Sequence, residues 1–227
     1  MNGAIAIFVK TPGHSPIKTR LAAELGEAQA ADFHRRSAAA VASVAHQAQA
    51  QHGLTVYWAV AESEGEALAQ WNGFPALPQP GGGLGERMAR VHAQLVARDG
   101  FGILIGADTP QLAIDHLEEA RRWLSSPGPR LALGRAHDGG FWLFGANLSP
   151  PLEVWRAIEY SVPGTAEALR ADMCGLGAWR ELPLLTDADH ASDLPAVVQA
   201  LDALPRPTPE QRALAAWIHA LQPRLVL

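Results

Sequence analysis

The sequence of 227 residues contains one cysteine, Cys174. It therefore cannot form an internal disulfide or a metal site built from clustered cysteines. No stretch approaches the roughly 18 consecutive apolar residues that a membrane-spanning helix requires, so we expect no membrane span. The opening segment, MNGAIAIFVK, has no basic residues ahead of its short apolar run. We therefore expect no signal peptide and a cytoplasmic location.

The chain also lacks an excess of positive charge, because 18 basic and 23 acidic residues give a formal net charge of −5. Nucleic-acid binders usually present a basic surface, so we expect no nucleic-acid partner. An apolar content of 48% is ordinary for a globular protein. The length suits one large α/β domain, and we expect a single domain spanning residues 1–227.

Lysine is scarce, since only Lys10 and Lys18 accompany the many arginines. Both lie beside the same loop of proline and glycine. A lysine ammonium is a compact, mobile charge, unlike the flat arginine guanidinium. This placement indicates a loop that uses a point charge, as in phosphate binding, although chance explains it equally well.

Short apolar runs rich in β-branched residues alternate with longer segments of helical character. This alternation predicts βαβ units, and hence a doubly wound, mostly parallel sheet with helices on both faces. The expected strands are Ala4–Val9, Leu54–Ala61, Phe101–Ile105, Arg130–Leu133, Phe141–Ala146 and Arg180–Leu185. The main expected helices are Lys18–Leu25, Ala28–Gln51, Gly85–Arg98, Asp115–Leu124, Thr165–Cys174, Asp193–Leu204 and Gln211–Leu221.

Basic residues occupy the predicted start of the first helix, where Lys18 and Arg20 fall in its first turn. A helix N-terminus offers free N–H groups and a partial positive charge, so this turn suits an anion such as phosphate. The Walker pattern is absent. The alternative is a solvated basic turn whose cations pair with nearby acids.

Acidic residues follow predicted strands, which is where open parallel sheets bind ligands. Asp108 follows one strand and precedes a Thr-Pro pair, a position suited to holding Mg²⁺ or Mn²⁺. An Asx turn or a helix cap explains it equally well. Asp187 and Asp189 follow a later strand and are candidate partners. We interpret Asp193 as an N-cap residue or first-turn acid of the next helix.

Two glycine-containing turns are further candidates. Gly81–Arg87 leads into a predicted helix, and its glycines would let the backbone approach a ligand, although a flexible loop explains them too. Asp138, in the segment HDGG, is a candidate base or a group that orients an acceptor, although a hairpin turn accounts for the same residues.

Four segments taken together resemble one family, the bacterial glycosyltransferase-A-like nucleotide-diphospho-sugar transferases. The segments are Lys10-Thr-Pro…Ile17-Lys-Thr-Arg-Leu21, Gly83-Leu-Gly-Glu-Arg-Met88, Gly106-Ala-Asp-Thr-Pro-Gln-Leu112 and Asp138-Gly-Gly-Phe-Trp-Leu-Phe-Gly145. The acidic segment Asp187–Leu194 is similar to one that closes the related small nucleotidyltransferases. The resemblance runs from about Ala4 to Leu194.

This resemblance implies a glycosyltransferase-A fold that binds a nucleoside phosphate together with Mg²⁺ or Mn²⁺. It implies that Lys18 and Arg20 meet phosphates, with Lys10 beside them. It places Gly83, Gly85 and Arg87 near the nucleotide. It also makes Asp108 and Asp189 the metal ligands. The sequence departs from the family at Ser15, at His190 and Ala191, and at Phe141 and Trp142.

The expected activity is a metal-dependent transferase with an activated nucleotide donor and an unknown small-molecule acceptor. Glycosyl transfer from a nucleoside diphosphate sugar is the first interpretation, with Lys18 and Asp138 as catalytic residues. Nucleotidyl transfer from a nucleoside triphosphate, with release of pyrophosphate, is the second. The departures from the family pattern keep a non-catalytic nucleotide-binding protein as a third. The helix carrying Trp217 is a possible homodimer contact.

Overall fold

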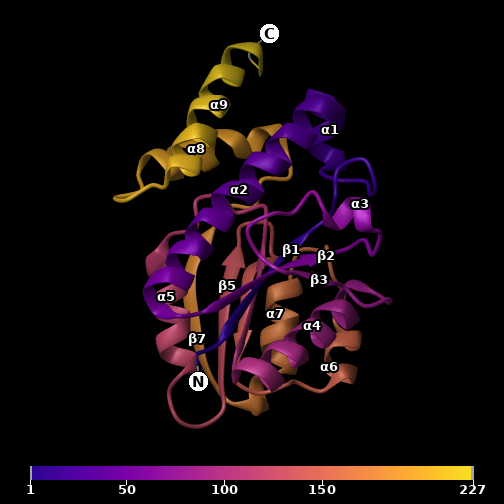
Figure 1. The fold of residues 1–227 in the computed structure, drawn as a ribbon, viewed down its shortest axis with the longest axis vertical. Helices are drawn as coiled ribbons and strands as arrows, with labels where there is room; N and C mark the ends of the chain where they lie inside the picture. The colour runs from indigo at the N-terminus through magenta and orange to yellow at the C-terminus, as the bar shows by residue number, and fades with distance from the viewer. Residues whose placement is uncertain (1, 226–227) are drawn as a thin grey trace.

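The computed structural model describes residues 2–225, and its centre is one seven-stranded sheet (Figure 1). The strand order across the sheet is β3-β2-β1-β4-β6-β5-β7. The strands are β1 (Ala4–Val9), β2 (Thr55–Val60), β3 (Ala76–Pro78), β4 (Gly102–Gly106), β5 (Arg130–Ala136), β6 (Phe141–Ala146) and β7 (Ala178–Leu185). Only β6 runs antiparallel to its neighbours, β4 and β5. The predicted mostly parallel, doubly wound sheet is therefore confirmed.

Helices cover both faces of the sheet (Figure 1). The helices are α1 (Thr19–Leu25), α2 (Glu27–His52), α3 (Gly65–Leu68), α4 (Leu84–Asp99), α5 (Ile114–Leu124), α6 (Leu152–Ala157), α7 (Thr165–Asp172), α8 (Leu194–Asp202) and α9 (Pro209–Leu225). Most lie within a few residues of the expected ranges. The expected helix Thr165–Cys174 ends at Asp172, and a separate 3-10 turn, Cys174–Leu176, follows it.

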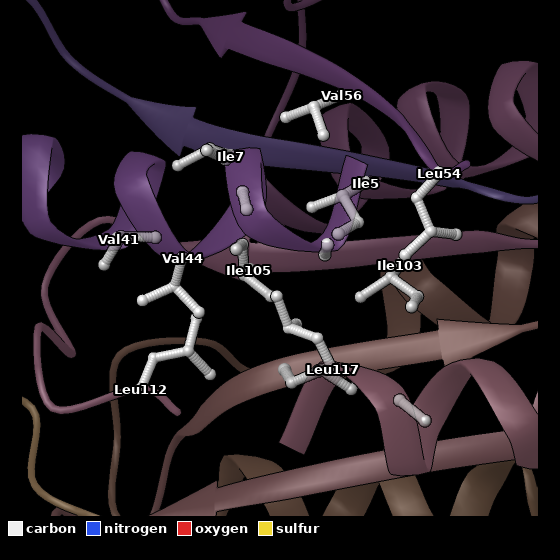
Figure 2. Packing of buried hydrophobic residues seen from close by; sticks show 14 of the residues in the cluster. Ile5, Ile7, Val41, Val44, Leu54, Val56, Ile103, Ile105, Leu112 and Leu117 are labelled. Carbon is white, nitrogen blue, oxygen red and sulfur yellow. The ribbon is translucent and has the colours of Figure 1, made fainter. Parts of the chain in front are cut away.

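The strands are apolar on both faces because both faces are covered. In β1, Ile5 and Ile7 pack with α2 and α5, whereas Ala4 and Ala6 pack with α4, α6 and α7. This alternation follows from the two-residue period of a strand. Figure 2 shows the first of these layers, in which Val44 of α2 meets the isoleucines of the central strands. The sheet is thus a rigid platform for the loops at its edge.

A third layer lies beyond one end of the sheet, where α1 and the first part of α2 pack against α8 and α9 (Figure 1). Leu21 of α1 and Phe33 of α2 are buried there against Leu194 and Ile218. Trp217, considered above as a dimer contact, packs on Phe33 with ring centroids 6.2 Å apart. Its ring is therefore engaged within the chain. Across the residues described, no helix combines the length and apolarity that crossing a bilayer requires.

Burial lowers the pKa of His92, on α4, to about 4. The ring is fully buried, with its centroid 5.2 Å from that of Phe144. Unfolding restores a pKa near 6.5, so between pH 6.5 and 4 the unfolded chain binds more protons than the folded one. Stability should therefore fall as pH drops through this window, by at most about 1.4 kcal/mol per pH unit. Urea unfolding of wild type and His92→Leu at pH 7 and pH 5 should show a smaller loss in the variant. An equal loss in both would contradict this assignment.

Candidate active site

The candidate site lies at the carboxyl ends of β1, β4 and β7. Lys10 follows β1, Asp108 comes two residues after β4, and Asp187 and Asp189 follow β7. Strands β4 and β7 are not neighbours in the sheet. Their extensions nevertheless meet, because the backbone N–H of Ala188 donates to the carbonyl oxygen of Asp108 at 3.3 Å. The fold therefore brings together acids that are about 80 positions apart in the sequence.

The ammonium of Lys18 lies among these acids. Its Nζ atom is 3.0 Å from Asp108 Oδ2, 2.9 Å from Asp189 Oδ1 and 3.6 Å from Asp187 Oδ1. The Lys18 side chain is only 3% exposed, whereas each of the three carboxylates is about one-third exposed. One buried cation therefore lies among three partly exposed carboxyl groups. Both Asp108 and Asp189, expected from the sequence to be metal ligands, lie within 3.0 Å of this single charge.

The backbone at Lys18 has an unusual conformation. Lys18 precedes the first residue of α1 and adopts a left-handed conformation, with φ 42° and ψ 45°. Such a conformation costs energy in a residue that has a Cβ atom. Among the residues described, Ser161 is the one other non-glycine residue with positive φ. Strained residues of this kind concentrate at functional sites.

The electrostatics of the cluster follow from burial and mutual attraction. Burial alone would lower the pKa of Lys18, but Asp108, Asp187 and Asp189 outweigh it and raise that pKa above its ordinary value. Burial alone would raise the pKa of Asp108, yet Lys18 and His34 hold it well below its usual range. Burial and repulsion from the neighbouring acids raise the pKa of Asp187, against the opposing effect of Lys18. Asp187 is thus the carboxyl group whose ionised form a further positive charge would stabilise most.

Two further side chains contact the cluster. Arg20 Nη1, in the first turn of α1, lies 3.1 Å from Asp189 Oδ2. His34 Nδ1, on α2, lies 3.5 Å from Asp108 Oδ1, while its Nε2 atom lies 2.9 Å from the carbonyl oxygen of Lys10. The His34 ring therefore links the loop after β1 to the acidic cluster.

The residues present fit a divalent metal ion. Asp138, Asp187 and Asp189 each offer an oxygen within 4.8 Å of the others. The Oδ1 atoms of Asp108 and Asp187 are buried without a hydrogen-bond partner among the described residues. Carboxylate oxygens are the ligands preferred by Mg²⁺ and Mn²⁺. Asp138 comes from the β5–β6 turn, where its Oδ1 atom accepts the N–H of Gly140 at 2.9 Å.

A cavity of about 860 Å³ opens beside the cluster. Its lining includes Lys10, Lys18, Arg20, Asp138, Asp187 and Asp189, together with Phe141, Tyr160 and Ser161. A smaller cavity of about 260 Å³ shares Lys10, Lys18 and Asp189 with the first and adds Arg87 and Asp108. Seven of the nine site residues expected from the sequence thus line one or both of these cavities.

The glycines of the loop before α4 have a structural explanation. A Cβ atom at Gly85 would lie 2.5 Å from the carbonyl oxygen of Trp155 and 2.5 Å from the Tyr160 ring. Gly85 thus allows α4 to approach α6 closely. Gly83 faces open space, and its N–H donates to Glu86 at 3.1 Å. Neither glycine is among the residues lining the two cavities described above.

Replacing Gly85 with alanine should destabilise the protein by about 1–3 kcal/mol, because the added methyl group overpacks the contact between α4 and α6. Gly81 is the matched control, since a Cβ atom there would meet nothing within 4 Å. Urea unfolding of Gly85→Ala and Gly81→Ala measures the difference. Equal stability of the two variants would show that close packing does not require Gly85.

Two features of the site were not predicted from the sequence. His34 was not a candidate, and its only signal is a polar ring on an Ala-rich helix. Asp187 was a candidate partner of Asp108 but not an expected metal ligand. Asp193 lies at the N-cap position of α8, as expected, but its carboxylate accepts N–H groups of the acidic segment instead of capping that helix.

The fold is that of the nucleotide-diphospho-sugar transferases, as the resemblance implied. The crystal structure of a Desulfovibrio desulfuricans G20 protein, provisionally assigned as such a transferase, superposes with a TM-score of 0.82. It is 23% identical in sequence, and the match covers 98% of this chain and 97% of that one. This likeness establishes the shared fold.

The chain belongs to a bacterial family, DUF2064, described as "Uncharacterized protein conserved in bacteria", which matches residues 40–162. A comparison with proteins of curated function finds no match.

Two other solved structures are more distant. A homologue of Mycobacterium tuberculosis Rv0371c from Mycobacterium sp. strain JC1 is 11% identical, with coverage of 88% and 98% and a TM-score of 0.50. A CMP:2-keto-3-deoxy-manno-octonic acid synthetase in complex with CTP is 14% identical, with coverage of 89% and 99% and a TM-score of 0.49.

Proposed function

We propose that this protein is a metal-dependent transferase that acts on an activated nucleotide donor. The observation that carries the proposal is the convergence of Asp108, Asp187 and Asp189 on one cation at the wall of an open cavity. Glycosyl transfer from a nucleoside diphosphate sugar is the first candidate reaction.

The phosphates of the donor would contact the cations around the two cavities. Arg20 is 57% exposed and lies beside Asp189, so its guanidinium can reach solvent and a phosphate at once. Lys10 and Arg87 line the smaller cavity from two other elements. In the proposed reaction, Lys18 and Arg20 neutralise the charge that grows on the leaving phosphate.

The metal ligands in this proposal are Asp108 and Asp189, with Asp187 as a third carboxylate. A bound Mg²⁺ or Mn²⁺ would supply positive charge that stabilises the phosphate oxygens. The buried Oδ1 atoms of Asp108 and Asp187 support this assignment, because among the described residues they accept no hydrogen bond, and such atoms are costly unless they gain one.

Asp138 is the proposed residue for the acceptor. It lines the larger cavity, and its hydrogen bond from Gly140 fixes the carboxylate next to the other acids. From this position it would orient the acceptor hydroxyl or remove its proton. The acceptor is a small molecule of unknown identity.

The same cations would also bind a triphosphate, so nucleotidyl transfer is the second candidate. A thermal-shift panel of nucleotides and nucleotide sugars, with and without Mn²⁺, tests donor binding. Products then separate the reactions, since glycosyl transfer releases a nucleoside diphosphate and nucleotidyl transfer releases pyrophosphate. Nucleotide binding indifferent to Mn²⁺, or no binding, would instead favour the non-catalytic interpretation.

A further inference from the structure

We propose that Glu24 is a positioning residue that fastens the acidic segment, residues 187–193, to α1 and so sets the place of Asp189 in the site. The inference rests on the proposed function, in which Asp189 is a metal ligand. Glu24 itself does not contact the cluster. It acts through the segment that carries Asp189.

Both carboxylate oxygens of Glu24 are used on this segment. Its Oε1 atom lies 2.8 Å from His190 Nδ1, and its Oε2 atom accepts the backbone N–H of Ala191 at 2.8 Å. The hydrogen bond with the His190 ring, together with that from Ala191, lowers the pKa of Glu24. Glu24 is 166 residues away from His190 in the sequence, so the contact joins two distant parts of the chain.

The other side of the segment is held by Asp193. Its Oδ2 atom accepts the backbone N–H of Asp189 at 2.9 Å and that of His190 at 2.7 Å. Three successive N–H groups, at positions 189, 190 and 191, therefore donate to two carboxylates. Because Asp193 lies within the segment itself, the side-chain contacts that tie residues 190 and 191 to another part of the chain come from Glu24.

Helix α1 places two contacts with the acidic segment on one of its faces. Arg20 contacts the Asp189 side chain, and Glu24 contacts the two residues that follow Asp189. Residues four apart lie on the same face of a helix, one turn from each other. Helix α1 thus contacts both the side chain of Asp189 and the backbone that follows it.

The residues on and just before α1 make two kinds of contact with the acidic segment. Lys18 and Arg20 contact the carboxylate of Asp189, where a metal or phosphate would compete for them. Glu24 contacts the His190 ring and the backbone N–H of Ala191, neither of which is a metal ligand in the proposed function. Its removal should therefore loosen the acidic segment without taking a ligand away from the site.

The experiment compares Glu24→Ala with the control Asp202→Ala in the full chain. Asp202 Oδ2 and His219 Nε2 also lie 2.8 Å apart, and that pair, like the Glu24–His190 pair, is roughly half exposed. It joins α8 to α9, away from the acids. Titration with MnCl₂, followed by the paramagnetic resonance signal of free Mn²⁺, should show roughly 10-fold weaker binding in Glu24→Ala, as for other residues that orient metal ligands. Asp202→Ala should bind as wild type does.

Two further measurements separate positioning from general loss of structure. Amide hydrogen exchange should quicken at Asp189, His190 and Ala191 in Glu24→Ala, with unchanged protection in the central strands. Glu24→Gln keeps an oxygen for the N–H of Ala191, so its Mn²⁺ affinity should lie between those of wild type and Glu24→Ala.

Unchanged Mn²⁺ affinity in Glu24→Ala, or an equal loss in Asp202→Ala, would overturn the inference. Unchanged exchange at Asp189 in Glu24→Ala would overturn it as well. Failure of the proposed function has a different signature, because wild type itself would then bind no Mn²⁺. Hydrogen exchange would still decide in that case whether Glu24 holds the acidic segment.

Discussion

Replacing Lys18 with methionine should lower the free energy of unfolding by about 2–4 kcal/mol when no divalent ion is present. Removing one partner of a fully buried ion pair typically costs 3–5 kcal/mol, because the other charge stays buried. Partial solvent exposure of Asp108, Asp187 and Asp189 reduces this cost, since water screens them. Methionine retains most of the side-chain volume, so the loss measures the missing charge.

Mn²⁺ should restore part of the stability lost in Lys18→Met, because a divalent ion can replace the ammonium among the carboxylates. The rise in melting temperature on adding MnCl₂ should therefore be larger in the variant than in wild type. Turnover should nevertheless fall by about 10²–10³-fold, the usual cost of removing a contact to charge that develops in the transition state.

Lys10→Met is the matched control for Lys18→Met. Lys10 is exposed and enters no ion pair among the described residues, so its replacement should change stability little. Differential scanning fluorimetry and urea unfolding measure both variants. A Lys18→Met protein as stable as wild type in EDTA would show that the ammonium does not neutralise the acids.

Asp189→Asn should weaken Mn²⁺ binding by about 100-fold or more, since changes to residues that merely orient metal ligands already cost 10–100-fold. Stability should change little, because Lys18 keeps its contacts with Asp108 and Asp187. The variant thus separates metal binding from folding, which Lys18→Met does not.

The measurement is again a MnCl₂ titration, with Asp202→Asn as the control for loss of an exposed carboxylate. Transferase turnover at a Mn²⁺ concentration that half-saturates wild type should fall in parallel with the affinity. Wild-type Mn²⁺ affinity in Asp189→Asn would remove Asp189 from the metal site and leave Asp108, Asp138 and Asp187 as the remaining candidates.

Much of the fold could be predicted because strand and helix patterns are local. The apolar run Ala4–Val9 and the Ala-rich segment that follows the first loop have the periods of a buried strand and a helix, and the structure has both. The meeting of Asp108 and Asp189 was implied by the family resemblance, whereas their positions after strands only made it one possibility. Residues that follow strands of a parallel sheet gather at one edge.

The parts that could not be predicted depend on contacts between distant residues. The sequence analysis placed Lys18 as a phosphate ligand, with pairing to nearby acids as the alternative, and the structure pairs it with three acids. The left-handed backbone at Lys18 was not predicted either. The packing role of Gly85 similarly depends on Trp155, in a helix about 70 positions later. No local pattern carries either fact.

Substitutions in the helical layer formed by α8 and α9 should disturb the site from a distance. Leu21 of α1 is buried against these helices, and Asp193, at the start of α8, holds the acidic segment. A cavity opened at Ile218, far along the chain from every charged group of the cluster, would let α1 shift. Substitutions that destabilise this layer should therefore lower activity as changes at the site do, and stabilising osmolytes should partly restore it.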